Sequence, residues 1–388
     1  MPDDLDPRDL GPHRHPRSPV MDHCPPTLPA HAYYDQAWHD QELRTIWSQN
    51  WVWAGRLADV KPGTMQRRQI GPASVILCRA PDGAVSAFHN TCRHRGAELC
   101  ALAEQPMGKL ITCKYHNFAY AASDGRLVAT GQAHPTADFD RDAHGLFKVA
   151  VKLWNGFVFL NLAPNPGDLC PDTGLTALDN WPMEALVTGH RAVKEVAGNW
   201  KILWENYNEC LHCASIHPEL SDLVPIYKTG VMAPNEALSW NPDDAARPTM
   251  RPGAASWTLS GQACGPEFAG LTPAERQVGY LFVTLYPTAF VVAHVDYVRA
   301  IVFEPLAPDR TRVTAEWYFP QATLDQPGFD AAKVAEFAKI VLAQDAEVVE
   351  MNQRGLRSPV FRHGSLMPEE YAVRDFDTWV LREMETTR

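Results

Sequence analysis

The stretch from Glu205 to Pro218, ENYNECLHCASIHP, holds two cysteines, two histidines and two glutamates in fourteen residues. Such a density of metal-ligating side chains is typical of a metal site. One interpretation is a zinc site formed by Cys210, His212, Cys213 and His217, because zinc is bound by thiolates and imidazoles. The other interpretation uses the two histidines and leaves both thiols out. The two interpretations imply different proteins.

A second group of possible ligands lies upstream, in TCRHRGAELC and TCKYHNFAY. Each segment offers one Cys-His pair: Cys92 with His94, and Cys113 with His116. Four such ligands can hold structural zinc, or a [2Fe-2S] cluster with two thiolates on one iron and two imidazoles on the other. Zinc fingers keep like ligands together, so the alternation of Cys and His favours the cluster. Cys100 falls outside the pattern and is expected to be a buried thiol.

Iron enzymes that use oxygen often bind the metal through two histidines and one carboxylate. On a regular helix, His212 and His217 would lie about 140° apart. We therefore expect the helix NWKILWENYNEC to end near Cys213, with His217 in the turn before Pro218. Glu209 lies three residues before His212, at a spacing where a helix points both side chains the same way. A carboxylate on the second ring nitrogen is common for metal-bound histidine.

The third ligand is expected on a later helix, DAAKVAEFAKIVLAQDAEVVEMNQRG. Asp345 lies on the side of an apolar stripe there, and a metal is a good partner for a buried carboxylate. A salt bridge remains the alternative for this residue. The stripe is formed by Val334, Phe337, Val341, Val348 and Met351.

Two kinds of residue pattern follow each other along the chain, and they predict the elements that position these residues. From about 63 to 162 short alternating runs surround Asp-Gly and Asn-Gly turns, which predicts a small all-β domain with hairpins. A proline- and glycine-rich linker near 164–172 separates it from a region with helices and strands. Further strands are expected within 279–319, and a long helix from about Asp330 to Asn352.

Composition narrows the function classes. The chain has 388 residues, 45% of them hydrophobic, and a net charge of -11, which argues against nucleic-acid binding. It has neither a bilayer-length apolar run nor an apolar signal core, so we expect a cytoplasmic protein with a loosely ordered N-terminus through Pro29. It also lacks GxGxxG and GxxxxGK[ST] motifs. Any hydride transfer from a dinucleotide therefore belongs to another protein.

The sequence resembles the Rieske non-haem iron oxygenase α subunits. The C-x-H…C-x-x-H pattern looks like the Rieske motif, and the resemblance extends from LPAHAYYDQAWHDQELRTIWSQNWVWAGR to QDAEVVEMNQRGLRS. The family's acidic residue, two residues, His, four residues, His pattern falls on Glu209, His212 and His217, and its late aspartate on Asp345. The resemblance implies a Rieske [2Fe-2S] cluster and a mononuclear Fe(II). One departure is Asn117-Phe118, where the family usually has Gly-Trp.

The resemblance also implies an α+β fold. An N-terminal extension (1–40) would precede an all-β Rieske domain (41–165). A catalytic domain (166–388) would follow, with an antiparallel sheet flanked by helices of the helix-grip, START-like kind. The cluster ligands implied are Cys92, His94, Cys113 and His116, and the iron ligands are His212, His217 and Asp345.

Further roles follow from the same resemblance. Glu209 is expected to link His212 to His116 of a neighbouring subunit in a homotrimer, with an ordinary carboxylate within one chain as the alternative. Asn206 is expected near the iron without binding it, or as a helix-packing amide. Cys210 and Cys213 are expected to be buried small hydrophobes.

The activity implied is hydroxylation by O2, with electrons from NAD(P)H delivered by a separate flavin/iron-sulfur reductase. Within the family, the sequence most resembles the branch that N-demethylates glycine betaine, carnitine or stachydrine. Alternatives are hydroxylation or O-demethylation of an aromatic acid, and a Rieske electron carrier without oxygenase activity. Aromatic faces could hold a quaternary ammonium, and the candidates are Trp204, Trp257, Tyr280, Tyr286 and Trp317.

Overall fold

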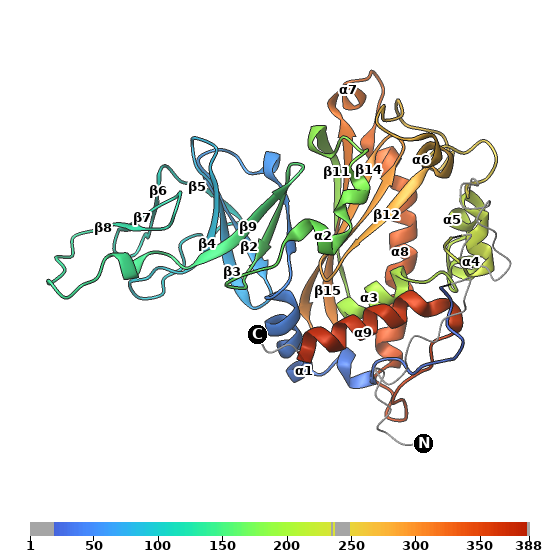
Figure 1. Ribbon diagram of the computed structural model, residues 1–388, viewed down its shortest axis with the longest axis horizontal. Helices are drawn as coiled ribbons and strands as arrows, with labels where there is room; N and C mark the ends of the chain where they lie inside the picture. Colours follow the sequence, from blue (N-terminus) through green and yellow to red (C-terminus); the bar gives the residue numbers. More distant parts are fainter. Residues whose placement is uncertain (1–18, 234–235, 237–248, 386–388) are drawn as a thin grey trace. The chain divides into compact units, whose positions relative to one another are not determined.

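The computed structural model describes residues 19–233, 236 and 249–385 (Figure 1). The chain forms two compact units. The smaller unit runs from Ile46 to Asp172, and the larger one combines the chain up to Thr45 with the chain from Thr173 onward. The short helix α2 (Leu169–Thr173) lies at the junction. The division into 1–40, 41–165 and 166–388 stays a prediction.

The smaller unit is built from antiparallel strands. They form a seven-stranded sheet in the order β1-β10-β9-β4-β3-β2-β5 and a three-stranded sheet in the order β6-β7-β8. Their bounds are β1 (Val52–Arg56), β2 (Thr64–Ile70), β3 (Ala73–Arg79), β4 (Val85–His89), β5 (Glu104–Pro106), β6 (Leu110–Thr112), β7 (Phe118–Ala121), β8 (Leu127–Thr130), β9 (Lys148–Trp154) and β10 (Phe157–Asn161).

The predicted all-β domain and its three hairpins are confirmed. Tight turns join β3 to β4, β7 to β8 and β9 to β10, as the Asp-Gly and Asn-Gly pairs indicated. In the last turn Asn155 and Gly156 both have positive φ, 44° and 78°. That pair of conformations matches the right-handed twist of the strands, and Asn-Gly adopts it at low cost.

The larger unit contains one five-stranded antiparallel sheet, in the order β11-β15-β14-β13-β12. Its strands are β11 (Leu186–Val196), β12 (Tyr280–Leu285), β13 (Ala289–His294), β14 (Val298–Ala307) and β15 (Arg310–Pro320). Its helices are α1 (Gln36–Glu42), α3 (Trp200–Tyr207), α4 (Cys213–Ile216), α5 (Pro218–Leu223), α6 (Pro273–Val278), α7 (Gln321–Leu324), α8 (Ala331–Gly355) and α9 (Tyr371–Glu385).

Helix α8 runs beside the sheet in Figure 1 and contacts β11, α3 and α5. The predicted strands within 279–319 and this long helix are confirmed, and Asp330 caps the helix through its side chain. The predicted apolar stripe is wrong at its C-terminal end. Met351 is 60% exposed, and Val349 and Gln353 are buried in its place. The elements packed against the helix, and not its apolar periodicity alone, decide which of its side chains are buried.

The N-terminal prediction is also corrected. Of the segment predicted to be loosely ordered, residues 19–29 are described, and they pack within the larger unit. Leu28 is fully buried, and the Leu366 amide donates to the Pro25 carbonyl at 2.8 Å. The polar composition of this segment led to the wrong prediction, because backbone hydrogen bonds to a part of the chain far away in the sequence hold the segment in place.

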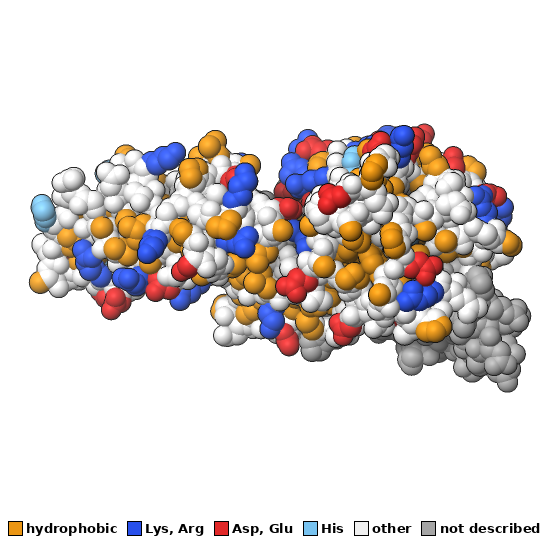
Figure 2. Space-filling model, turned by 90° about the horizontal axis from the view of Figure 1, so that it is seen from above, with side chains coloured by type: hydrophobic (Ala, Val, Ile, Leu, Met, Phe, Trp, Pro, Cys, Tyr) orange, Lys and Arg blue, Asp and Glu red, His pale blue; other side chains and the backbone are white. Residues whose placement is uncertain are grey.

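No helix of the described residues is long and apolar enough to span a bilayer. On the face shown in Figure 2, acidic and basic side chains are scattered among each other. The acidic side chains are therefore not concentrated in one patch on that face.

Candidate metal centres

Three predicted ligands converge in the larger unit. One ligand atom from each of His212, His217 and Asp345 lies within 4.8 Å of the others. The Asp345 carboxylate is 2.9 Å from His217 Nε2 and 3.6 Å from His212 Nε2. His217 is 1% exposed, whereas the side chains of His212 and Asp345 are 18% and 19% exposed. Two imidazoles and one carboxylate meeting at one point match the donor set of non-haem iron(II) sites.

Short elements position the two histidines. Helix α3 ends at Tyr207, six residues earlier than the predicted end near Cys213. Glu209 and His212 therefore lie in a turn, not on one helix. His217 follows the single-turn helix α4 and has non-helical backbone angles (φ −119°, ψ 70°), as expected for a residue before proline. This break turns both imidazoles toward Asp345 on α8.

The second ring nitrogen of each histidine has its own partner. His212 Nδ1 hydrogen-bonds to Glu209, and His217 Nδ1 lies 2.8 Å from the Gln344 side-chain oxygen. The Gln344 amide nitrogen in turn donates to Glu219 at 3.0 Å. Because carboxylate and amide oxygens accept, both Nδ1 atoms donate, and both Nε2 atoms are left to face the third ligand.

Sequence reasoning missed Gln344. The only signal was its position directly before Asp345, and a single helix offers many such neighbours. The pairing became visible because α8 and α5 contact each other in the folded chain.

The electrostatics of this group favour positive charge. Burial disfavours the charged imidazolium of His212, but the hydrogen bonds with Asp345 and Glu209 outweigh it and raise the pKa to about 9. Burial likewise raises the pKa of Asp345, yet the two histidines lower it below its ordinary value. The carboxylates thus draw a cation to the point where the three ligands meet, and a divalent metal ion is such a cation.

Three other residues considered from the sequence border this group. The Asn206 amide nitrogen lies 3.3 Å from His212 Nε2, so Asn206 is close to the ligands. Cys210 and Cys213 are buried, but they form a disulfide across the turn, with Cα atoms 4.9 Å apart. The predicted burial of the two residues is confirmed. The turn after α3 also brings their sulfur atoms together in a bond that the prediction of two small hydrophobic side chains did not include.

A cavity of about 380 Å³ adjoins the three ligands. Aromatic rings are part of its lining, and so are Glu209 and Asn206. Of the five aromatic residues considered from the sequence, only Trp257 lines it. The other rings come from Tyr207, Tyr227, Phe282, Phe290 and Phe303.

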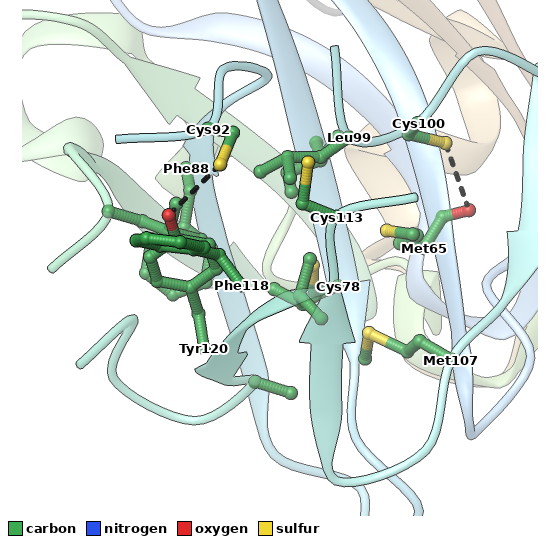
Figure 3. Close-up of a cluster of buried hydrophobic side chains, with 14 of the residues drawn as sticks. Met65, Cys78, Phe88, Cys92, Leu99, Cys100, Met107, Cys113, Phe118 and Tyr120 are labelled. Carbon is green, nitrogen blue, oxygen red and sulfur yellow. Dashed lines mark hydrogen bonds between the residues drawn. The ribbon is translucent and has the colours of Figure 1, made fainter. Parts of the chain in front are cut away.

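The predicted cluster ligands lie in the smaller unit. Cys92 and Cys113 are 3% and 2% exposed within one buried cluster (Figure 3), and the Cys92 sulfur lies 3.1 Å from the Tyr120 hydroxyl. The rings of His94 and His116 are 4.7 Å apart between centroids. The buried Nδ1 of His116 has no hydrogen-bond partner among the described residues. Two buried thiols, two adjacent imidazoles and an orphaned ring nitrogen fit a [2Fe-2S] cluster.

The departure at Asn117-Phe118 leaves this geometry intact. Asn117 has φ 57°, a left-handed conformation that asparagine tolerates best after glycine. Phe118 stacks on the His94 ring at 4.5 Å with 3° between the planes. Gly131 approaches the same loop so closely that an added Cβ would lie 2.2 Å from the His116 carbonyl oxygen.

Comparisons with known proteins agree with both centres. Residues 50–140 match the family described as Rieske [2Fe-2S] domain, and residues 183–386 match the family described as ring hydroxylating alpha subunit (catalytic domain).

Individual relatives cover nearly the whole chain. The chain is 30% identical to a glycine betaine monooxygenase oxygenase subunit from Chromohalobacter salexigens, over 91% of this chain and 84% of the relative. It is 27% identical to a carnitine monooxygenase oxygenase subunit from Escherichia coli, over 88% of each. A solved quaternary ammonium Rieske monooxygenase has the same fold, with a TM-score of 0.73, 20% identity and 99% coverage of both chains. This chain therefore belongs to the Rieske ring-hydroxylating oxygenase α subunits, terminal oxygenases that carry a [2Fe-2S] cluster and a mononuclear non-haem iron.

Proposed function

We propose that this oxygenase removes an N-methyl group from a betaine-like quaternary ammonium compound. The observation that carries the proposal is the 30% identity over 91% of the chain to a glycine betaine monooxygenase oxygenase subunit. The carnitine-oxidising relatives act on the same chemical class. An alkyl-ammonium group is also the kind of cation that aromatic faces attract.

The cavity suits such a substrate in size and lining. At about 380 Å³ it is in the range of small-molecule sites. Tyr207 stacks on Phe290 at 3.6 Å, and Trp257 packs edge-on against Phe282 at 5.9 Å, so rings from three elements and one loop form an aromatic wall. A methylated nitrogen held against this wall would present a methyl group to the adjoining ligands.

The reaction adds one oxygen atom of O2 to a methyl C–H bond and reduces the other to water, with two electrons and two protons. The resulting carbinolamine loses formaldehyde and leaves the demethylated amine. The bound iron supplies the site for oxygen activation. We propose His212, His217 and Asp345 as its ligands, and Cys92, His94, Cys113 and His116 as the ligands of the cluster.

The chain's own residues keep this site ordered. Glu209 and Gln344 hold the two imidazoles in the tautomer with Nε2 free, and α8 brings Asp345 to the same point. The apolar rings exclude water from the substrate methyl groups, and the Asn206 amide borders the ligands.

Electron delivery is part of the proposal. The name oxygenase subunit, carried by the relatives, implies a separate reductase, which we propose draws on NAD(P)H. We propose a homotrimer in which Glu209 links His212 to His116 of a neighbouring copy. A solved relative is described as transferring electrons between subunits, and Glu209 is only 12% exposed while already bonded to His212.

An aromatic acid is the competing substrate, because apolar rings would also accept a benzene ring. A simple electron carrier is excluded, since the match to the catalytic domain spans residues 183–386.

Formaldehyde release tests the proposal. The iron-loaded, cluster-containing enzyme would be supplied with a reductase and NADH, and offered glycine betaine, carnitine, γ-butyrobetaine and choline beside a panel of methoxylated and plain aromatic acids. We expect oxygen uptake and formaldehyde with at least one N-methylated ammonium compound. Turnover of aromatic acids alone would overturn the proposal.

A further inference from the structure

A buried arginine lies in the wall of the cavity. Arg299 is the second residue of β14, the central strand of the five-stranded sheet, between Val298 and Ala300, which are both fully buried. It is only 5% exposed, yet it lines the cavity beside the three proposed iron ligands. A buried arginine near the start of the central strand of a sheet needs an explanation, because burying a charge without a partner is costly.

Arg299 has no counter-ion among the described residues. Arg299 takes part in no ion pair there, and its Nε is buried without a hydrogen-bond partner. Its guanidinium carbon lies 5.8 Å from the centroid of the Trp257 ring. A ring face offsets only a small part of the cost of desolvating a cation.

The neighbouring titratable groups do not fill this role. Asp345 attracts Arg299 electrostatically, but its carboxylate is engaged with His217 and His212, and a bound metal would take up its negative charge. Burial, reinforced by Arg299, lowers the pKa of His294 far below its usual range, so that ring is neutral. Burial keeps the nearby phenols protonated by raising the pKa of Tyr207, Tyr227 and Tyr297.

Two other cations line the cavity, and they differ from Arg299 in one respect. Lys194 and Lys339 are exposed, so water solvates their ammonium groups. Arg299 alone of these three is desolvated before any ligand arrives, and it therefore gains most from an anion.

We propose that Arg299 binds the carboxylate of the substrate, and that the enzyme prefers zwitterionic betaines to quaternary ammonium alcohols. The inference rests on the proposed N-demethylation and deepens it. A guanidinium can donate two parallel N–H bonds to a carboxylate. The carboxylate would thus sit at Arg299 on β14, and the methylated nitrogen would lie along the aromatic wall toward the proposed iron ligands. Arg299 acts as a specificity-determining residue.

Paired substrates and variants test this inference. Glycine betaine carries a carboxylate where choline carries an alcohol, and both have the same trimethylammonium group. R299M removes the charge and keeps much of the volume, and R299K keeps the charge but cannot donate two parallel N–H bonds. K333M is the matched control, because it removes an exposed cation on α8 that does not line the cavity. Each enzyme would be assayed for KM and kcat by formaldehyde release, and for direct binding of both compounds by calorimetry.

We expect R299M to lose roughly 100-fold in kcat/KM and in affinity for glycine betaine, the scale of a lost pair of charge-assisted hydrogen bonds. The values of R299M for choline should change less than about threefold. For glycine betaine, R299K should fall between R299M and the unchanged enzyme, and K333M should stay close to the unchanged enzyme. Equal losses for both compounds, or no loss for either, would overturn the carboxylate site while leaving the N-demethylation proposal intact.

Stability separates a binding role from a structural one. Since an unpaired buried cation destabilises a fold, R299M without ligand should melt no lower than the unchanged protein. A melting point that is clearly lower, with binding of both compounds lost, would show that Arg299 is structural and would overturn the inference.

If no ammonium compound yields formaldehyde, the proposed function fails, and the zwitterion preference fails with it. The anion site is then decided separately, by calorimetry with an aromatic acid and its methyl ester. Loss of acid binding alone in R299M would keep Arg299 as a carboxylate site, and equal binding in both enzymes would remove it.

Discussion

At the scale of single residues, the two nitrogens of each imidazole in the mononuclear centre have different roles. One nitrogen of His212 and of His217 faces Asp345, and the other is held by Glu209 or Gln344. A histidine ring with one nitrogen fixed by an acceptor has only one tautomer available for a metal. The cluster of donor atoms is therefore oriented before any metal binds.

Asp345→Asn should lose iron from this centre and keep the cluster. An amide carries no charge and is a weaker ligand, so we expect iron affinity to fall by at least about 10- to 100-fold, the range seen even for outer-sphere changes. The check is the iron and sulfide content with the visible spectrum of the cluster. Glu347→Gln, an exposed position on the same helix, is the control and should change neither. Full iron content in the Asp345→Asn variant would exclude Asp345 as a ligand.

Glu209→Gln tests the proposed electron route. Both metal centres should persist, since the amide oxygen can still accept from His212 Nδ1, while turnover falls by roughly 100-fold or more, as expected when a link acting only in the reaction is lost. The measurement is single-turnover oxidation of the prereduced cluster beside the metal content. Glu219→Gln, two hydrogen bonds away from the metal through Gln344, is the comparison. An unchanged rate of cluster oxidation would show that electrons do not pass through Glu209.

At the scale of elements, function depends on where regular structure stops. Helix α3 ends at Tyr207, α4 makes a single turn, and His217 stands between α4 and the proline of α5. In the smaller unit, the loop that carries His116 depends on a left-handed residue, Asn117, and on a close approach by Gly131. Irregular backbone at these points directs side chains that a continuous helix or strand would point elsewhere.

Gly131→Ala should disturb the cluster without unfolding the sheet. Its Cβ would lie 2.2 Å from the His116 carbonyl oxygen, so the loop must shift, and its positive φ of 62° adds strain of about 1 kcal/mol. We expect an altered visible and electron paramagnetic resonance spectrum of the cluster. Gly83→Ala has a positive φ but open space around its Cβ, which makes it the matched control. Identical spectra in the two variants would show that the close approach is unimportant.

At the scale of the whole molecule, distant segments close the larger unit around buried ionisable groups. Lys201 on α3 pairs with Glu42 of α1 at 2.5 Å, both fully buried, and Tyr33 donates to Glu205 at 2.7 Å. Burial is the main cause that raises the pKa of Glu205, to about 7 from its ordinary 4.5. Burial and the Glu205 charge also raise the pKa of Asp377.

These shifts predict a pH-dependent stability with a definite sign. The folded protein holds the Glu205 proton more tightly than the unfolded chain, so its contribution is complete below about pH 4.5 and is lost as the pH rises through about 7. Glu205→Gln cannot ionise and still accepts from Tyr33. Its free energy of unfolding should fall less steeply over this window, by at most about 1.4 kcal/mol per pH unit.

Urea denaturation between pH 5 and pH 8 measures that slope. Glu336→Gln, an exposed position on α8, serves as the control. A slope equal to that of the unchanged protein would mean that Glu205 does not retain a proton in the fold.

The sequence by itself determined the all-β unit with its hairpins and the long helix that carries Asp345, and it predicted the types and order of the proposed metal ligands. These features are local, because ligand spacing, turn pairs and periodicity act over a few residues. The tertiary structure decided the rest: that Gln344 holds His217, that Cys210 and Cys213 are joined, that the N-terminal residues pack with Leu366, and that Arg299 faces a cavity without a counter-ion among the described residues. The Cys210–Cys213 bond spans only three positions and depends on where α3 ends. The other pairings join segments more than a hundred residues apart and depend on the packing of whole elements. No local pattern records which face of a strand will border a cavity.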